Sequence, residues 1–196
     1  MSALTFPATV APLDGPDDRA RLVAAARAGD LAAFERLIRQ YERLVLVTAM
    51  RMLGNVADAQ DASQEVFLRL YRNLGKVESN AALTSWLYRV TVNICHDLRR
   101  KRPDSAPMED AAQAKASEAD PQQASMEIER RKALDLGLKH LSEKERAALV
   151  LRDLEGLSTE EVARVLGSSQ ATVRSQIAKA RIKMRGFLDR YFRRRT

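Results

Sequence analysis

Polar and basic side chains of the kinds that bind nucleic acid recur at helical spacing near the end of the chain. Intervals of three and four residues place on one side of a helix Thr172, Ser175, Gln176, Lys179 and Lys183. Three arginines flank that face: Arg174, Arg181 and Arg185. Hydroxyl, amide and cationic groups pair with base edges and phosphates in a major groove. A solvated charged face is the alternative interpretation. The turn that precedes this helix favours the DNA-binding interpretation of the face.

A second polar face lies near the middle of the chain, after a predicted loop from Lys76 to Thr84. Its members at helical spacing are Arg89, Asn93, His96 and Arg100, with Arg99 and Lys101 nearby. Taken alone, this face could equally be solvated surface, but its continuity with the loop favours a second nucleic-acid surface. Trp86 stands where the loop becomes helix. A buried core position is the usual place for such a ring, and stacking on an unpaired base is the alternative.

An acidic face precedes both of these surfaces. Its members are Asp58, Asp61, Gln64, Glu65 and Leu68. Carboxylates on a basic protein would repel DNA, so this face is expected to meet solvent or another protein. The apolar Leu68 at its margin favours a protein partner.

The chain carries no convincing catalytic or metal-binding constellation. Its histidines, His96 and His140, and its single Cys95 cannot make a four-ligand zinc site, and no glycine-rich phosphate loop is present. Cys95 is expected to be a small buried residue. We therefore predict no metal, no cofactor and no enzyme activity.

The elements that position these faces are predicted to be helices. Asp30 is a plausible N-cap for a helix that ends at Gly54-Asn55, and apolar periodicity continues over about 58–74 and 85–102. In the second half, Ser142 with Glu145 and Ser158 with Glu161 have capping-box spacing. The second box begins a short helix, which leads through the turn at 167–169 to the basic helix. This order is typical of a helix-turn-helix.

Composition sets the wider limits. The 196 residues carry a net charge of +7 and a pI near 9.8, which suggests a polyanionic partner. One cysteine and the lack of a signal peptide or membrane segment predict a cytoplasmic protein. The fold class is all-α, with two small helical domains and a flexible acidic linker. The expected segments are a disordered tail 1–19, a first domain 20–102, a linker 103–127, a helix-turn-helix domain 128–190 and a basic tail 191–196. The linker is either a solvated spacer or lies in a positively charged groove of a partner.

Particular runs of residues resemble the sigma factors of bacterial RNA polymerase. The segment from Asp58 to Phe67, followed by Ser85 to Asn93 and Asp97 to Arg100, resembles sigma region two. Leu141 to Arg185, which includes Thr172-Val-Arg-Ser175, resembles region four. A short chain with only these regions is similar to the extracytoplasmic-function (ECF) sigma factors.

That resemblance implies partners and roles for the faces above. The acidic face would bind core RNA polymerase at the clamp of its beta-prime subunit, with the beta subunit as a further contact. The loop from Lys76 through Asn80 to Ser85, with Trp86, would capture a flipped base of the minus-ten element, while Arg89, Asn93, Arg99 and Arg100 hold the nearby DNA backbone. The residues that would meet the minus-thirty-five element are Thr172, Arg174, Ser175, Ala178 and Lys179. The linker would follow the RNA-exit path, and an anti-sigma factor is an expected partner.

Simple arithmetic agrees with this arrangement. A linker of some two dozen residues spans at most ~80 Å when extended. Promoter elements about seventeen base pairs apart are separated by ~58 Å. Opening each base-pair step costs ~1.4 kcal/mol, and stacking one captured base returns ~1–3 kcal/mol. One captured base cannot hold open a bubble of many pairs, so core polymerase must supply the remainder. The free protein is therefore expected to bind promoters weakly or without specificity.

Other functional classes remain open at the level of sequence. A stand-alone helix-turn-helix regulator with a sensing or dimerising helical domain would bind a palindrome unaided. An adaptor that uses the acidic helix is a second alternative, and an enzyme of nucleic-acid metabolism is a distant third. Co-purification with core polymerase separates a sigma factor from a dimeric repressor.

Overall fold

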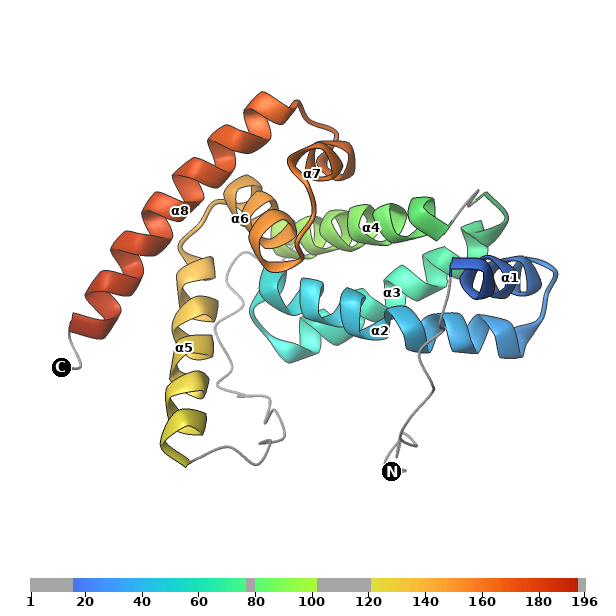
Figure 1. Cartoon of the computed structure of the whole chain (residues 1–196), viewed down its shortest axis with the longest axis horizontal. Helices are drawn as coiled ribbons and strands as arrows, with labels where there is room; N and C mark the ends of the chain where they lie inside the picture. Colours follow the sequence, from blue (N-terminus) through green and yellow to red (C-terminus); the bar gives the residue numbers. More distant parts are fainter. Residues whose placement is uncertain (1–15, 77–79, 102–120, 194–196) are drawn as a thin grey trace.

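The computed structural model describes residues 16–76, 80–101 and 121–193, and every regular element within these ranges is a helix. Two groups of helices lie side by side (Figure 1). The all-α prediction is confirmed. The structure does not describe residues 1–15, 77–79, 102–120 and 194–196. These ranges include most of the predicted tail 1–19 and of the predicted linker 103–127.

The N-terminal bundle is built from four α-helices. Its elements are α1 (Pro16–Arg27), α2 (Leu31–Leu53), α3 (Val56–Asn73), the 3-10 turn η1 (Leu74–Lys76) and α4 (Asn80–Lys101). Asp30 caps α2 as predicted, because its side chain accepts the Ala33 amide at 3.0 Å. Gly54 ends α2 with φ of 79°, in the left-handed region that favours glycine.

Apolar stripes of these helices meet in one core. Leu37, Val45 and Met52 of α2 are fully buried, as are Leu70 of α3 and Leu87 of α4. They recur at helical spacing, so burial of one face per helix explains why these segments fold together. The core holds α3 and α4 with their polar faces outward.

The C-terminal unit is the predicted helix-turn-helix with one helix before it. Its elements are α5 (Pro121–Lys139), α6 (Glu143–Leu149), the π-helical turn η2 (Val150–Leu154), α7 (Thr159–Leu166) and α8 (Gln170–Arg193). Both capping boxes are present: Ser142 pairs with Glu145, and Ser158 with Glu161. Gly167 ends α7 in the left-handed region and turns the chain into α8.

Several predicted boundaries are wrong. Residues 16–19 belong to α1 and not to the tail, residues 121–127 belong to α5 and not to the linker, and residues 191–193 belong to α8 and not to the basic tail. The loop expected to reach Thr84 is also wrong, because α4 begins at Asn80. Leu83, expected in that loop, is fully buried, so its burial accounts for the extra helical turn.

The two groups of helices are in direct contact. Helix α7 packs on α4, and the C-terminal part of α2 meets α5, α6 and η2. In Figure 1, α7 lies beside α4, while α5 and α8 extend away from the N-terminal bundle. The predicted nucleic-acid faces of α4 and α8 thus belong to two units that are in direct contact.

Candidate nucleic-acid and protein interfaces

The N-terminal half of α8 has a buried side and an exposed side. Val173, Ile177, Ala180 and Met184 are buried against the rest of the C-terminal unit. The predicted contacts on the other side are all exposed, namely Thr172, Arg174, Ser175, Ala178 and Lys179. Helix α8 therefore presents hydroxyl, guanidinium and ammonium groups together on an accessible surface.

Local hydrogen bonds order the start of this face. The Ser169 hydroxyl accepts the Thr172 amide at 3.1 Å and lies 2.9 Å from the Thr172 hydroxyl. The Arg174 guanidinium donates to the Gln170 side chain at 3.0 Å. The contact from Ser169 was not predicted, although a serine just before a helix is a common cap.

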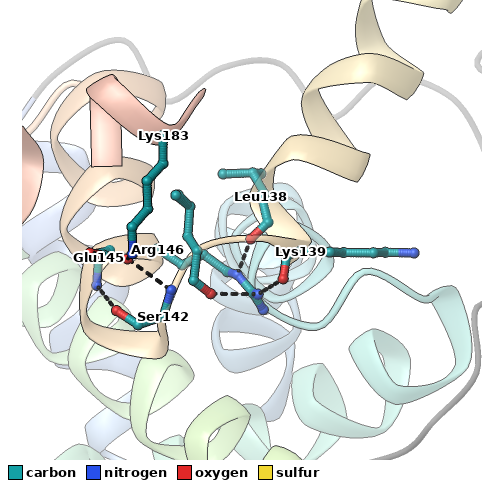
Figure 2. Close-up of polar contacts among 7 residues, drawn as sticks. Leu138, Lys139, Ser142, Glu145, Arg146 and Lys183 are labelled. Atoms are coloured by element: carbon teal, nitrogen blue, oxygen red, sulfur yellow. Dashed lines mark hydrogen bonds and ion pairs between the residues drawn. The ribbon is translucent and has the colours of Figure 1, made fainter. Parts of the chain in front are cut away.

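Two further basic residues of α8, Arg181 and Lys183, form ion pairs within the protein. Lys183 donates to both carboxylate oxygens of Glu145, at 2.8 and 2.7 Å (Figure 2). Arg181 forms a two-point contact with Asp153 at 2.8 and 2.7 Å. These contacts join α8 to α6 and η2, so both cations hold α8 in place.

The Glu145 carboxylate has partners on two sides. It receives Lys183 and also accepts the Ser142 amide at 3.0 Å, while Ser142 accepts the Glu145 amide (Figure 2). The hydrogen bond from Lys183, with smaller contributions from Ser142, lowers the pKa of Glu145 below its usual 4.5. The charged form is thus the one that the fold requires.

The polar face of α4 is only partly free. Arg89, Asn93 and Arg100 are exposed. Arg100 also contacts Asp97 at 3.0 Å, and Arg99 donates to the Met52 carbonyl of α2 at 3.3 Å. Ser85 and Trp86 are half-buried, and Trp86 packs against the core from inside α4 and not from a loop edge. The side chains of Lys76 and Asn80 lie outside the described set.

The acidic face of α3 is also only partly exposed. Asp61, Gln64 and Leu68 are exposed, and Leu68 keeps 51% of its surface accessible. Asp58 and Glu65 are half-buried. The Asp58 carboxylate accepts from Asn55 at 2.7 Å, and Glu65 accepts from Arg69 at 2.7 Å.

An apolar groove of about 450 Å³ adjoins the exposed part of α3. It runs between α2 and α3 and is lined by Phe34, Ile38, Glu42, Ser63, Gln64, Phe67, Leu68 and Tyr71. The Phe34 and Tyr71 rings meet edge to face at 5.2 Å. An exposed leucine beside an apolar groove with a carboxylate on the same helix can accept an amphipathic partner helix.

Arg146 was not predicted and is the central polar residue of the junction. It is 1% exposed, and its guanidinium donates to the carbonyls of Leu138 at 2.7 Å, Lys139 at 3.2 Å and Leu141 at 3.2 Å (Figure 2). It also donates to the Met52 carbonyl of α2 at 2.7 Å. Both α5 and α2 end here, so one cation satisfies carbonyls at the negative ends of two helices.

A second contact across the junction centres on Glu155. One of its carboxylate oxygens accepts Arg51 of α2 at 2.7 Å, and the other accepts the Tyr88 hydroxyl of α4 at 3.2 Å. Arg51 also donates to the Leu154 carbonyl at 3.3 Å. Burial, followed by the charge and hydrogen bond of Glu155, raises the pKa of Tyr88 above its usual 10.0.

Cys95 is fully buried, as predicted, and burial raises the pKa of its thiol to about 12. Among the described residues, no group of three histidine, cysteine or acidic side chains is placed to hold a metal ion. No helix in the described ranges combines the length and apolar character needed to cross a membrane.

Comparison with known families gives two matches in the order that the sequence predicts. Residues 37–105 match Sigma-70 region 2, and residues 131–184 match Sigma-70, region 4. The first range contains α4 and the exposed face of α3. The second contains the helix-turn-helix.

Individual proteins agree with these matches. The ECF RNA polymerase sigma factor SigM of Mycobacterium tuberculosis is 36% identical over 84% of this chain and 82% of its own length. The RNA polymerase sigma-H factor of Pseudomonas aeruginosa is 33% identical, over 82% of this chain and 89% of its own. The ECF RNA polymerase sigma-E factor of Escherichia coli is 32% identical, over 82% and 88%.

Solved structures show the same fold. CnrH, determined in complex with the cytosolic domain of CnrY, superimposes with a TM-score of 0.64 at 27% identity, over 87% of this chain and 97% of that one. The sigma factor RpoE of Bartonella quintana, determined with the anti-sigma factor NepR, gives 0.62 at 21% identity, over 80% and 96%.

Proposed function

This chain belongs to the sigma-70 family, in its ECF group, and from that premise we propose which of its surfaces meet polymerase and promoter. It is a sigma factor that directs RNA polymerase to promoters. The observation that carries the assignment of surfaces is that the exposed polar faces of α4 and α8 fall within the two matched regions. We infer a binding role without catalysis, performed in the cytoplasm where polymerase and DNA are found.

The α3 face is our candidate for core polymerase. Asp61, Gln64 and Leu68 are accessible, and Gln64 and Leu68 line the apolar groove. These three residues would dock on the clamp helices of the beta-prime subunit. Asp58 and Glu65 each accept a hydrogen bond from a neighbouring side chain of the protein. In this proposal they shape the surface and add negative charge at its edge. The predicted contact with the beta subunit is part of the same proposal.

The α4 face is our candidate for the minus-ten element. Arg89, Asn93 and Arg100 point to solvent and would hold phosphates of the melted strand. Arg99 has a structural contact with α2 and would contribute charge at longer range. Lys76, Asn80, Ser85 and Trp86 are proposed to form the nearby base pocket.

The start of α8 is our candidate for the minus-thirty-five element. The N-terminal part of a recognition helix is the part that enters the major groove. Arg174 and Lys179 would bind phosphates or base edges, and Thr172 and Ser175 supply short hydrogen-bonding groups. The methyl group of Ala178 allows close approach to the groove. Gln176 is half-buried, so less of its side chain is accessible to DNA.

Transcription reconstituted with purified core polymerase tests these assignments. Selected genomic fragments should yield specific transcripts only when the chain is added. Lys179→Ala should lower transcription about tenfold from promoters that need the upstream element, since one phosphate or base contact is worth ~1–3 kcal/mol. Lys132→Ala, which removes an exposed lysine of α5, is the matched control. Equal transcription by wild type and Lys179→Ala would contradict the proposed contact of α8 with the minus-thirty-five element.

Polymerase capture tests the α3 surface separately. Leu68→Ser should weaken retention of core polymerase on the immobilised chain, because it removes an exposed apolar anchor. Ile128→Ser removes a comparable side chain, 65% exposed on α5, and should leave retention unchanged. If both variants retain polymerase as wild type does, the docking surface lies elsewhere.

We also propose an anti-sigma factor as a partner. The support is that RpoE, which shares this fold, is seen bound to the anti-sigma factor NepR. An anti-sigma factor would silence this chain by covering its polymerase- and DNA-binding faces. Overexpression of the chain alone should activate its promoters by exceeding the supply of inhibitor, and failure to do so would contradict this form of control.

A further inference from the structure

We propose that Arg27 of α1 is a positioning residue for minus-ten recognition, because it fixes the backbone of the turn η1 that leads into the proposed base pocket. The Arg27 guanidinium donates to the Gly75 main-chain carbonyl at 2.8 Å. The two residues are 48 positions apart, so this bond ties α1 to a distant part of the chain. The inference rests on the proposed function in one respect, which is the assignment of Lys76 and Asn80 to that pocket.

Helix α1 packs on α2, on α4 and on η1 (Figure 1). Val23 and Ala26 of α1 are buried, and they belong to the same apolar core as Leu74 of η1 and Leu83 of α4. Since Val23 and Ala26 lie one turn and one position before Arg27, their burial holds the base of its side chain in place. The match to Sigma-70 region 2 begins at residue 37, so α1 lies outside it. The contact with η1 is thus a feature of this chain that the matched region does not include.

The acceptor of this bond is at a helix end. Gly75 lies in the 3-10 turn that continues α3, and the last carbonyls of a helix have no partner within it. A cation is favourable at that end because the helix dipole is negative there. Arg27 is itself the last residue of α1, and Gly29, with φ of 95°, then turns the chain toward the Asp30 cap of α2. Arg27 therefore caps a helix end other than its own from a fixed corner between two helices.

The turn η1 supports the near side of the proposed base pocket. Lys76 is the last residue of η1, and α4 begins four positions later at Asn80. At ~3.3–3.6 Å per residue, so short a separation couples the placement of both ends. The buried Leu83 fixes the α4 side, and Arg27 fixes the η1 side. A pocket that is ordered before a base enters it loses less conformational freedom on capture. Arg27 thus favours the correct minus-ten sequence without touching a base.

Amide hydrogen exchange of the free chain tests the contact itself. Arg27 is exposed, and surface substitutions usually change global stability little, so Arg27→Ala should fold as wild type does. Exchange should accelerate at Leu74–Lys76 and stay unchanged in α2. Arg21→Ala removes another exposed arginine of α1 and should change neither segment. Unchanged exchange at η1 in Arg27→Ala, or an equal acceleration in Arg21→Ala, would overturn the role of Arg27 in holding the turn.

Transcription with core polymerase tests the consequence for promoter choice. The readout is the ratio of transcript from a target promoter to transcript from the same promoter with a scrambled minus-ten element. Arg27→Ala should lower this ratio about fivefold, which is the scale of one hydrogen bond. Arg27→Lys should recover part of the ratio, because an ammonium can also donate to a carbonyl. Arg21→Ala should leave the ratio as in wild type.

The ratio separates positioning from a direct contact of Arg27 with DNA. Loss of a phosphate contact lowers binding to all sequences nearly alike, so the ratio would not change. An unchanged ratio in Arg27→Ala, or an equal fall in Arg21→Ala, would therefore overturn the inference while leaving sigma activity intact. A wild type that does not distinguish the two promoters would contradict the proposed function and this inference with it, and hydrogen exchange would still decide whether Arg27 holds η1.

Discussion

Arg146 is buried, and no carboxylate among the described residues forms an ion pair with it. The surroundings of its guanidinium explain how this is tolerated. A guanidinium has five N–H donors in a planar fork, and here the fork meets four main-chain carbonyls. Those carbonyls lie at the ends of α5 and α2 and in the turn after α5, where helices expose unpaired acceptors. The arginine thus acts as a shared C-terminal cap, and its charge is opposite in sign to both helix ends.

Replacement of this side chain should be costly. Arg146→Met keeps much of the volume but leaves several buried carbonyls without a donor, so the free energy of unfolding should fall by ~2–4 kcal/mol. Arg146→Lys should recover part of the loss, since an ammonium can reach fewer of these acceptors. Denaturant titration measures the change. Arg130→Ala, at an exposed arginine of α5, should stay within ~0.5 kcal/mol of wild type.

The Glu145 carboxylate makes the free energy of unfolding depend on pH in the acid range. Its pKa is lowered in the folded state, mainly by Lys183, relative to a usual value of 4.5. Its contribution to stability is therefore complete above 4.5 and is lost as pH falls through the lowered folded-state value. Denaturant titrations at a series of pH values between 7 and the acid range should show this loss in wild type and a shallower slope in Glu145→Gln. Glu143→Gln removes an exposed carboxylate from the same turn, and a slope change as large as that of Glu145→Gln would contradict the assignment.

At the scale of elements, local signals predicted the helices wherever a cap and a periodic apolar stripe coincide. Asp30 and Gly54 bound α2, and the serines of both capping boxes begin α6 and α7, as the sequence indicates. Two of the boundary errors share a cause. Pro16 and Pro121 were treated as parts of irregular segments, yet each is the first residue of a helix, where its missing N–H costs nothing.

The faces of these helices were predicted less completely than their positions. Helical spacing placed Lys183 with Lys179, but it cannot show that Glu145 of another helix neutralises Lys183. The same limit applies to Arg99, whose acceptor is a main-chain carbonyl of α2. Exposure of Arg89, Asn93 and Leu68 did follow the predicted pattern, because these positions oppose the buried stripe.

The capping box of α7, formed by Ser158 and Glu161, is expected to stabilise the helix-turn-helix. Ser158→Ala removes the acceptor of the Glu161 amide and should lower the unfolding free energy by ~1 kcal/mol. Because α7 supports α8, the helix-turn-helix should loosen first, and amide hydrogen exchange in 159–166 should accelerate. Ser168→Ala, at an exposed serine in the turn, is the control. Unchanged exchange in the Ser158 variant would show that packing alone fixes this helix.

At the scale of the whole molecule, the fold is a pair of helical units whose buried apolar residues form one continuous core, and Arg146 and Glu155 make polar contacts across the junction. No pattern in the sequence predicted those contacts. Arg51 and Glu155 are 104 positions apart, and the acceptors of Arg146 are carbonyls that every residue carries. The proposed polymerase- and DNA-binding surfaces lie in one chain, so binding at one would raise the effective concentration of the other.

The central claim is that neither DNA-binding surface is sufficient alone and that polymerase positions both. Mobility-shift titration of a target promoter with the purified chain, with and without core polymerase, tests it most directly. The account predicts weak, salt-sensitive and non-specific binding by the free monomer, and tight promoter-specific binding once core polymerase is present. Tight binding of an inverted repeat by a dimer of this chain, with no response to polymerase, would contradict it.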